Sequence, residues 1–555
     1  MEKGAASYVD QPLKLSQLDQ VQWADEADVV VVGYGGAGVC TALEANAHGA
    51  DVLAIDRFGG GGATALSGGI VYGGGTSYQR TAGLNDTAEE MYNYLKQEIG
   101  DAVKSETLRR FCDQSDANFA WLVANGLSFG SRVFEGKRSY PPKGYDIYYS
   151  GNESSPLYTA KAKAFPRGHR VSGSGYTGKD FFLGLSQTAL ARGVRLSTHT
   201  VVNRLIVDSS DRVVGVEAIK LPAESEALKK HQAIIKKVNA YQRFMEKAAI
   251  NSAAKAREIE QISGEKIYIR AKKAVVLTTG SFAFNREMVR YYAPAFGQAM
   301  PLGTIGCDGS GVVLGQSVGA SVGHMDSATA WRSISPSESF VKAVVVNKQG
   351  RRFVAEDTYL GHLGNAIARQ DEQRAWLIID SATYWGAFKE TLPRLGEEGY
   401  LEFRGPLLLN LLINTTRGKT LKQLGEKLGL DSEAIVDEVA TYNQSVAAGQ
   451  NDAFSKKPAN CRALNEGSYY AIDISLGSQK FKCPTIPMGG LEVNEETGQV
   501  LSEAGGVIEG LYAAGRAAVG IPSGFYVSGS SLADCVFSGR RAGRHATELS
   551  QPTIN

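Results

Sequence analysis

An uninterrupted apolar run near the N-terminus of this 555-residue chain ends in three closely spaced glycines. Residues 28–38 read DVVVVGYGGAG, and Gly33, Gly35 and Gly38 have G-x-G-x-x-G spacing ahead of a helical pattern, TALEANAHG. Glycines let a strand turn sharply into a helix and let the backbone approach a pyrophosphate at the amide-rich helix N-terminus. The pattern therefore predicts an α/β fold that binds a dinucleotide.

A second strand pattern, ADVLAID, ends in Asp56, eighteen residues after Gly38. A carboxylate at that strand end can bind the hydroxyls of the adenosine ribose. Strand, glycines, helix, strand and acid occur in the expected order, so an ordinary glycine turn is the weaker interpretation. Gly36, Ala37 and Arg57 are further predicted cofactor contacts. NAD and FAD share this fingerprint, so the choice between them depends on the next segment.

A long loop of glycines and small residues follows, RFGGGGATALSGGIVYGGGT, and it suits a second, bulkier part of the ligand. It resembles the GGxTxxSGG loop of flavoproteins of the fumarate reductase and succinate dehydrogenase family, which wraps the FAD pyrophosphate and reaches the isoalloxazine. Thr64, Ser67, Gly68 and Gly69 match that loop. Membrane-bound members attach flavin through a histidine here, whereas GATALSGG has none. The resemblance therefore implies noncovalent FAD.

Further segments resemble the same family in order: THTVVNRLIVD, KAVVLTTGSFAFNREM, GCDGSGVVLGQSVGA and EGLYAAGRAAVG. The family usually has an acid after AAG, where this chain has an arginine. The next segment, SGSSLADCVFSGRRAG, resembles a helix that starts at the flavin, where backbone amides would bind the pyrimidine carbonyl and the positive helix end would favour the anionic reduced flavin. The resemblance implies cofactor contacts at Val202, Thr279, Gly280, Asp308, Gly515, Arg516, Ser531 and Leu532.

The resemblance also implies a Rossmann-like FAD-binding domain that is interrupted by an α+β capping domain. We assign 24–326 and 483–548 to the FAD-binding domain and 327–482 to the cap, which is expected to close over the flavin and supply half of the active site.

Residues 222–263 form an unusual insertion between two strand-like runs, GVEAIK and EKIYIRAKKAVV, that are expected to pair. An apolar stripe at helical spacing predicts a helical hairpin that packs on itself or on the protein body: Ile234, Val238, Tyr241, Met245 and Ala248. On this reading the hairpin is dispensable for flavin binding. The alternative uses a lysine excess for peripheral contact with a membrane or with a partner: Lys229, Lys230, Lys236 and Lys237.

Near the C-terminus, the stretch GIPSGFYVSGSSLADC has Tyr526 and Ser528 two residues apart. In an extended turn, both side chains would point the same way. Fumarate reductases have a substrate-binding arginine at this position, so its absence favours a neutral carbonyl substrate over a diacid. The Y-x-S-G-x-S-L pattern resembles 3-ketosteroid-Δ4-(5α)-dehydrogenases, which combine it with a cap tyrosine of an EDTY segment, here Tyr359. Tyr526, Ser528 and Tyr359 are therefore the predicted catalytic residues, although Tyr359 could also be a packing residue.

The implied reaction is desaturation of a 3-ketosteroid between carbons 4 and 5, with loss of a proton beside the carbonyl and hydride transfer to flavin N5. Three alternatives remain open. A Δ1-dehydrogenase is disfavoured because such enzymes typically have Y-P-G-A-G at this position. An enone or fumarate-type reductase would run the reaction in reverse, and a flavin-binding sensor would have no turnover. The chain has one dinucleotide fingerprint and no haem motif, so an external quinone or electron-transfer protein is the expected oxidant.

Composition excludes several other classes of protein. With 59 basic and 58 acidic side chains, the chain has no general attraction to nucleic acid. Its six cysteines lack zinc or haem spacing, so we expect reduced, mostly structural cysteines and no metal. We find no signal-peptide pattern or membrane-spanning run and expect a cytoplasmic protein, with peripheral membrane contact through 222–263 as the alternative.

Overall fold

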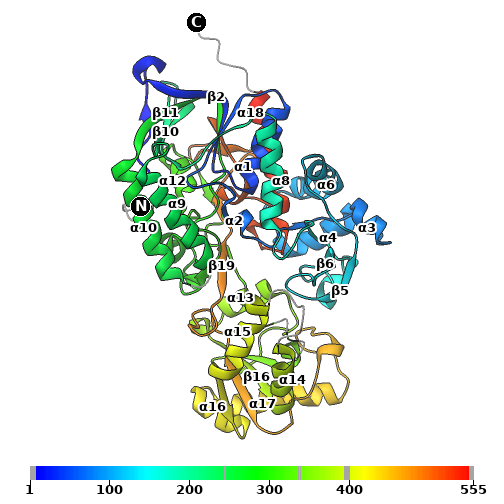
Figure 1. The fold of residues 1–555 in the computed structure, drawn as a ribbon. Coiled ribbons are helices and arrows are strands. Elements are labelled where there is room, and N and C mark those ends of the chain that lie inside the picture. Colours follow the sequence, from blue (N-terminus) through cyan, green and yellow to red (C-terminus); the bar gives the residue numbers. More distant parts are fainter. Residues whose placement is uncertain (1–7, 243–244, 335–336, 338, 393–399, 549–555) are drawn as a thin grey trace.

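The chain folds around a nine-stranded, mostly parallel sheet in the upper half of the molecule (Figure 1). The computed structural model describes residues 8–242, 245–334, 337, 339–392 and 400–548. The main path of the sheet runs β1-β9-β10-β11-β2-β3-β8, with β22 also on β11 and β21 on β22. The strands are β1 (Leu13–Lys14), β2 (Trp23–Val32), β3 (Val52–Ile55), β8 (Arg195–Ser197), β9 (Thr200–Val207), β10 (Val213–Lys220), β11 (Glu265–Leu277), β21 (Gln499–Leu501) and β22 (Val507–Ala513).

The first βαβ unit forms as the glycine pattern predicts: β2 and β3 pair in parallel, and α1 (Gly36–Ala47) connects them. Helix α18 (Ser530–Glu548) packs closely on α1 because Gly539 and Gly543 face it. A Cβ at these two positions would lie 2.8 Å from the Ala37 carbonyl oxygen and 2.5 Å from that of Thr41. Helix α8 (Gly178–Ala191) covers the same side of the sheet (Figure 1). The chain's last helix is therefore fixed beside its first glycine turn.

A smaller sheet and several helices lie beside this unit. Its strand order is β4-β7-β6-β5. The elements are β4 (Ile70–Tyr72), α3 (Ser77–Thr81), α4 (Ala88–Ile99), α5 (Ser105–Asp113), α6 (Ser115–Ala124), β5 (Val133–Lys137), β6 (Ile147–Tyr149), α7 (Pro156–Thr159) and β7 (Gly168–Arg170).

The lower half of the molecule is a four-stranded antiparallel sheet, in the order β15-β16-β18-β17, with helices around it (Figure 1). Separate apolar clusters contain alternating residues of its strands, as expected for a sheet with two buried faces. The elements are β15 (Val344–Asn347), α13 (Leu360–Ala368), β16 (Ala375–Asp380), α14 (Ser381–Thr391), α15 (Tyr400–Ile413), β17 (Thr415–Gly418), α16 (Leu421–Leu428), α17 (Ser432–Ala447) and β18 (Tyr469–Asp473).

A three-stranded sheet in the order β12-β19-β14 contains the segments that enter and leave this lower half. It consists of β12 (Met300–Pro301), β14 (Ala328–Ala330) and β19 (Pro484–Pro487). All of the lower sheet lies between 327 and 482, the range assigned to the cap; the domain boundaries themselves stay predictions. Nearby elements are α11 (Arg286–Tyr292), α12 (Ser310–Ser317), β13 (Val322–Gly323) and β20 (Gly490–Leu491).

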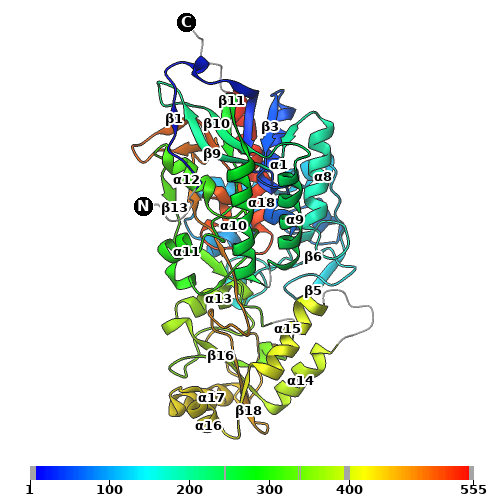
Figure 2. The same cartoon turned by 60° about the vertical axis from the view of Figure 1, so that its left-hand side comes forward.

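The insertion is a hairpin of two helices, α9 (Glu226–Tyr241) and α10 (Glu246–Ser263), seen clearly in Figure 2. Its ends meet as predicted, because β10 and β11 pair antiparallel with Lys220 opposite Glu265. The predicted stripe is only partly right: Val238 is buried, but α9 ends at Tyr241, and Met245 is 56% exposed. The packing itself is as predicted, because Ile235 and Val238 form one apolar cluster with Ala249 and Ala256 of α10 and with the loops that contain Phe284 and Ile305.

The six cysteines are all free, as predicted. Among the described residues, no helix combines the length and apolar character needed to span a membrane.

Candidate cofactor and active site

A cavity of about 520 Å³ opens where β2 meets α1. Its wall combines the glycine turn, the end of β3, the loop containing α2 (Gly62–Ala65), the start of β9, the segment after β11 and the loop before α12. It includes twelve of the predicted cofactor contacts: Gly33, Gly35, Gly36, Ala37, Asp56, Arg57, Thr64, Val202, Thr279, Gly280, Asp308 and Arg516. Most of the residues predicted from separate sequence motifs therefore surround one space.

The turn and its neighbours fit a nucleotide diphosphate. Gly33 has a φ of +98°, and a Cβ there would lie 2.8 Å from the Thr278 carbonyl oxygen. The Gly36 amide, at the start of α1, donates to the Thr64 hydroxyl at 3.1 Å. Within the described part of the chain, the buried Thr279 hydroxyl in this wall has no hydrogen-bond partner. The cavity size, the helix N-terminus and the unpaired hydroxyl together fit a polar ligand of this kind.

Asp56 and its neighbours also bond to the protein itself. The Asp56 carboxylate accepts backbone amides of Tyr34 at 2.9 Å, Phe58 at 2.8 Å and Gly60 at 3.0 Å, so it shapes the glycine loop. Its predicted contact with ribose stays a prediction. Arg57 forms ion pairs with Asp308 at 2.9 Å and with Glu260 of the hairpin at 2.8 Å. The two predicted contacts Arg57 and Asp308 are therefore bonded to each other.

Seven predicted cofactor contacts lie outside this cavity wall: Gly38, Ser67, Gly68, Gly69, Gly515, Ser531 and Leu532. Gly38 permits close packing, because a Cβ there would lie 2.0 Å from the Gly33 carbonyl oxygen. The Gly68 carbonyl accepts hydrogen bonds from the hydroxyls of Tyr140 and Thr177, which fixes the loop to the start of α8. Ser531 and Leu532 occupy the first turn of α18, where backbone amides lack partners within the helix.

Tyr526 and Ser528 lie together just before α18. The Gly529 amide lies 3.5 Å from the Tyr526 hydroxyl, and the Gly529 carbonyl accepts the Tyr72 amide of β4 at 3.2 Å. Burial raises the pKa of Tyr526, whereas the Gly529 amide, the positive charge of Arg516 and the Ser528 hydroxyl act to lower it. The turn thus supplies groups that stabilise a phenolate.

Two further tyrosines complete a cluster of hydroxyls with Tyr526 and Ser528. Burial raises the pKa of Tyr148 of β6, and a hydrogen bond with the Ser528 hydroxyl opposes that rise. Burial also raises the pKa of Tyr359, and its electrostatic interactions with Tyr526 and Tyr148 raise it further. The buried Tyr359 hydroxyl has no hydrogen-bond partner among the described residues. The fold therefore brings together the three predicted catalytic residues and adds Tyr148.

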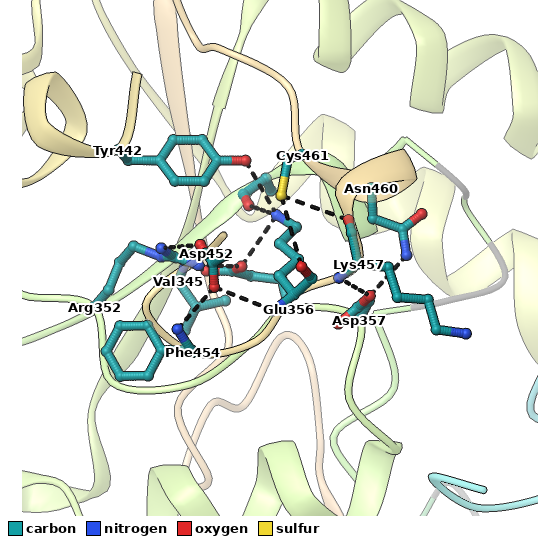
Figure 3. Close-up of polar contacts among 12 residues, drawn as sticks. Val345, Arg352, Glu356, Asp357, Tyr442, Asp452, Phe454, Lys457, Asn460 and Cys461 are labelled. Carbon is teal, nitrogen blue, oxygen red and sulfur yellow. Dashed lines mark hydrogen bonds and ion pairs between the residues drawn. The ribbon is translucent and has the colours of Figure 1, made fainter. Parts of the chain in front are cut away.

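The segment just before Tyr359 is anchored by polar contacts of Glu356 and Asp357, which Figure 3 shows. Glu356 accepts hydrogen bonds from Arg352 at 2.9 and 3.1 Å and from the Val345 amide at 2.9 Å, and it pairs with buried Lys456 at 3.1 Å. Asp357 accepts the Lys457 amide at 3.0 Å. These contacts fix both residues that precede the Thr358–Tyr359 pair.

A loop of the other half of the molecule holds Tyr359 from the opposite side. The Asn152 side-chain oxygen accepts the Tyr359 amide at 2.6 Å, and the Asn152 amide donates to Tyr94 at 2.8 Å. Gly361 permits close contact, because a Cβ there would lie 2.8 Å from the Tyr359 ring and 3.2 Å from Phe525. The cap and the cofactor-binding half therefore both fix this tyrosine.

Tyr526 also has a packing role. It lies in an apolar cluster with Ile486 and Met488. The Trp331 ring lies 5.3 Å from its own ring. These neighbours come from β19, from the residue after it and from the residue after β14.

Sequence reasoning missed Tyr148, Asn152, the cavity residue Tyr8 and the hairpin residues in the cavity wall. Tyr8 donates to Asp308 at 2.7 Å. Tyr148 belongs to a short apolar run with no motif, and single polar residues such as Asn152 have no distinctive spacing. The helical spacing of the hairpin residues was the one signal that could have revealed a shared face.

The fold and the site define an FAD-dependent oxidoreductase. The chain belongs to the family whose model is described as FAD binding domain, which matches residues 28–532.

Comparison with known proteins gives relatives along the whole chain. This chain is 37% identical to a 3-oxo-5-alpha-steroid 4-dehydrogenase of Comamonas testosteroni, over 91% of this chain and 96% of that protein. This chain is also 26% identical to a probable fumarate reductase of Shewanella frigidimarina, over 95% of this chain and 75% of that protein. The fold is similar to the crystal structure of a 3-ketosteroid-Δ4-(5α)-dehydrogenase from Rhodococcus jostii in complex with 4-androstene-3,17-dione. The TM-score is 0.79 and the sequence identity is 29%, over 97% of this chain and 100% of that chain.

Proposed function

We propose that this protein desaturates a 3-ketosteroid between carbons 4 and 5. The observation that carries the proposal is the cluster formed by Tyr526, Ser528, Tyr148 and Tyr359 beside the first turn of α18. The similarity to two enzymes of that named activity supports the same reaction. FAD, when bound, supplies the hydride acceptor.

The hydroxyl cluster fits the removal of a proton beside a carbonyl. A tyrosine is mostly protonated at neutral pH, so it acts as a base only where neighbours stabilise the phenolate. Ser528 interacts with both Tyr526 and Tyr148, so it can relay a proton between them. Hydroxyls aimed at the carbonyl oxygen would stabilise the charge that develops there. We assign proton removal to Tyr526 and Ser528 together, with Tyr148 and Tyr359 as supporting donors.

A neutral, apolar substrate suits the surroundings of Tyr526. Trp331, Met488 and Ile486 provide apolar side chains next to its ring. Arg332, which follows Trp331 in the sequence, is fully buried and donates to the carbonyls of Ser475 and Phe481 at 2.7 Å each. Both terminal nitrogens of Arg332 are therefore bonded to the protein, and a carbonyl is the better match to the hydroxyl cluster than a dicarboxylate.

Anaerobic reduction of the bound flavin by 5α-androstane-3,17-dione tests the proposal. We expect the yellow colour to bleach, and product analysis to find 4-androstene-3,17-dione. A double bond between carbons 1 and 2 would assign the protein to the Δ1 alternative. Absence of bleaching with the steroid, together with rapid reoxidation of reduced enzyme by fumarate or an enone, would favour the reductase alternative suggested by the fumarate reductase relatives.

We propose an external electron acceptor, either a quinone or an electron-transfer protein, because the sequence has one dinucleotide fingerprint and no haem motif. Peripheral membrane contact through 222–263 remains the alternative use of the hairpin lysines. Sedimentation with and without anionic vesicles tests it, and binding that survives neutralisation of these lysines would contradict it.

A further inference from the structure

One face of α9 lines the cofactor cavity. Gln232, Ile235, Lys236 and Asn239 belong to the cavity wall. Their spacing of three and four residues places them on one side of the helix. Ile235 is buried, whereas the three polar side chains are exposed to the cavity. An inserted hairpin thus presents a cation and two amides to the space expected to hold the cofactor.

Buried polar contacts attach the hairpin to the end of β3. Glu260 of α10 is 4% exposed and accepts from Arg57 at 2.8 and 2.9 Å and from His231 of α9 at 2.9 Å. The His231 ring stacks on that of Phe58, with centroids 5.8 Å apart. Both helices are therefore fixed to the residues that follow Asp56.

A third contact joins α9 to the opposite wall. The Gln242 side-chain oxygen accepts the Ile305 amide at 3.2 Å, and Ile305 also lines the cavity. Val238 and Ile235 pack in the apolar cluster that contains Ile305 and Cys307. These contacts fix the orientation of the helix, so the cavity-facing side chains hold their position without a ligand.

The position of the hairpin identifies the half of the cofactor that it meets. In this type of fold, the end of the second strand of the βαβ unit meets the adenosine ribose, and the helix N-terminus meets the pyrophosphate. The hairpin is attached next to Asp56, at that strand end, whereas Tyr526 and Ser528 lie before α18. A lysine complements phosphate charge, and carboxamides can bond to adenine or ribose.

We propose that the α9–α10 hairpin is part of the cofactor site, and that Lys236, with Gln232 and Asn239, binds the adenosine diphosphate half of FAD. On this proposal, residues 222–263 are needed for full flavin affinity, in contrast to the expectation from sequence that they are dispensable. Replacing 222–263 by a short turn should remove these contacts and also leave Arg57 without Glu260.

Equilibrium titration of the flavin-free protein tests the proposal, with FAD followed by its fluorescence and ADP by calorimetry. We expect Lys236→Met to weaken both FAD and ADP binding on the order of tenfold, as for loss of a charged hydrogen bond. The adjacent Lys237→Met is the matched control: Lys237 is exposed but outside the cavity wall, so both affinities should stay at the wild-type value.

The outcomes are distinct. Wild-type affinity of Lys236→Met for FAD and ADP would overturn the proposal, and so would weaker FAD binding with unchanged ADP binding, because the contact would then lie elsewhere. The Gln232→Ala/Asn239→Ala variant changes only cavity-exposed side chains and provides the same test should Lys236→Met fold poorly. Both readouts measure binding, so they do not depend on whether a steroid is the substrate.

Discussion

At the scale of single residues, the proposed chemistry depends on hydroxyl groups that affect one another's pKa. Arg516 stands where related flavoproteins usually have an acid, and it lines the cofactor cavity. Its positive charge lowers the pKa of Tyr526, which burial raises. An arginine in place of the usual acid fits a site that must stabilise a phenolate.

The hydroxyl pair should act as one unit. We expect Tyr526→Phe to keep FAD but to slow flavin reduction by 5α-androstane-3,17-dione by roughly tenfold or more, because the ring stays and only the hydroxyl is lost. Ser528→Ala should also be slow. In a shared relay, the double variant is much less impaired than the product of the two single effects. Anaerobic stopped-flow absorbance measures all three rates. A Tyr526→Phe enzyme that is reduced at the wild-type rate would end the mechanism.

Glu153 should make stability depend on pH. Burial raises its pKa to about 7 from 4.5, and the charges of Arg167 and Glu98 also act on it. A raised folded-state pKa contributes stability that is fully present below the unfolded pKa and lost as the pH rises through the folded one. Between about pH 4.5 and 7 the protein therefore loses stability on the order of 3 kcal/mol from this group.

Glu153→Gln removes that titration and keeps an oxygen for the Gly151 amide, which donates to Glu153 at 2.8 Å. We expect the variant to have nearly the wild-type melting temperature at pH 5 and a higher one at pH 8, as measured by calorimetry. A difference between the two proteins that stays constant over this range would contradict the assignment.

At the scale of elements, the segment before α13 connects the cap to the proposed active site. Its anchor, Glu356, is 1% exposed and pairs with Arg352 and Lys456. Removing one partner of a buried ionic network leaves uncompensated charge, which costs about 3 kcal/mol or more. We expect Glu356→Gln to lower the free energy of unfolding by that amount and to slow flavin reduction through displacement of Tyr359.

Glu438→Gln is the matched control for Glu356→Gln. Glu438 pairs with the exposed Arg351 at 3.6 Å in the same half of the molecule. Surface pairs contribute at most about 1 kcal/mol, so this variant should unfold close to wild type in denaturant titration. Equal stability of the two variants would show that the buried network does not hold the cap.

At the scale of the whole molecule, the two halves contribute to one site. The cap provides Tyr359, and the cofactor-binding half provides Tyr148, Tyr526 and Ser528. The loop at Asn152 and the close contact at Gly361 join them. If the proposed function is correct, turnover requires both halves in this arrangement, whereas the residues of the cofactor cavity come from one half.

The attachment of FAD is also a property of the whole molecule. The flavin loop at 57–76 contains no histidine for a covalent bond. Acid or heat should therefore release the flavin into solution when the chain precipitates, since the cavity that holds it is lost on unfolding. Absorbance of the supernatant checks this, and yellow colour that remains in the washed precipitate would show a covalent link.

Sequence patterns alone were enough to predict the α/β fold, the dinucleotide turn, the hairpin and the residues that match family motifs. These depend on local patterns: an apolar run before glycines, a helical repeat, or a short motif such as EDTY. It also predicted cofactor contacts at twelve residues that the structure places on one cavity wall.

Which of these residues contact one another could be learned only from the folded chain. Arg57 was predicted to contact the cofactor, yet its strongest partner is Glu260, more than two hundred residues away. Tyr148 joins Ser528 from a strand without a motif, and Lys236 faces the cofactor cavity while Lys237 does not. Such pairings depend on how segments that are distant in sequence pack against each other. A local sequence pattern contains information only about residues that are close along the chain, so it does not predict these partners.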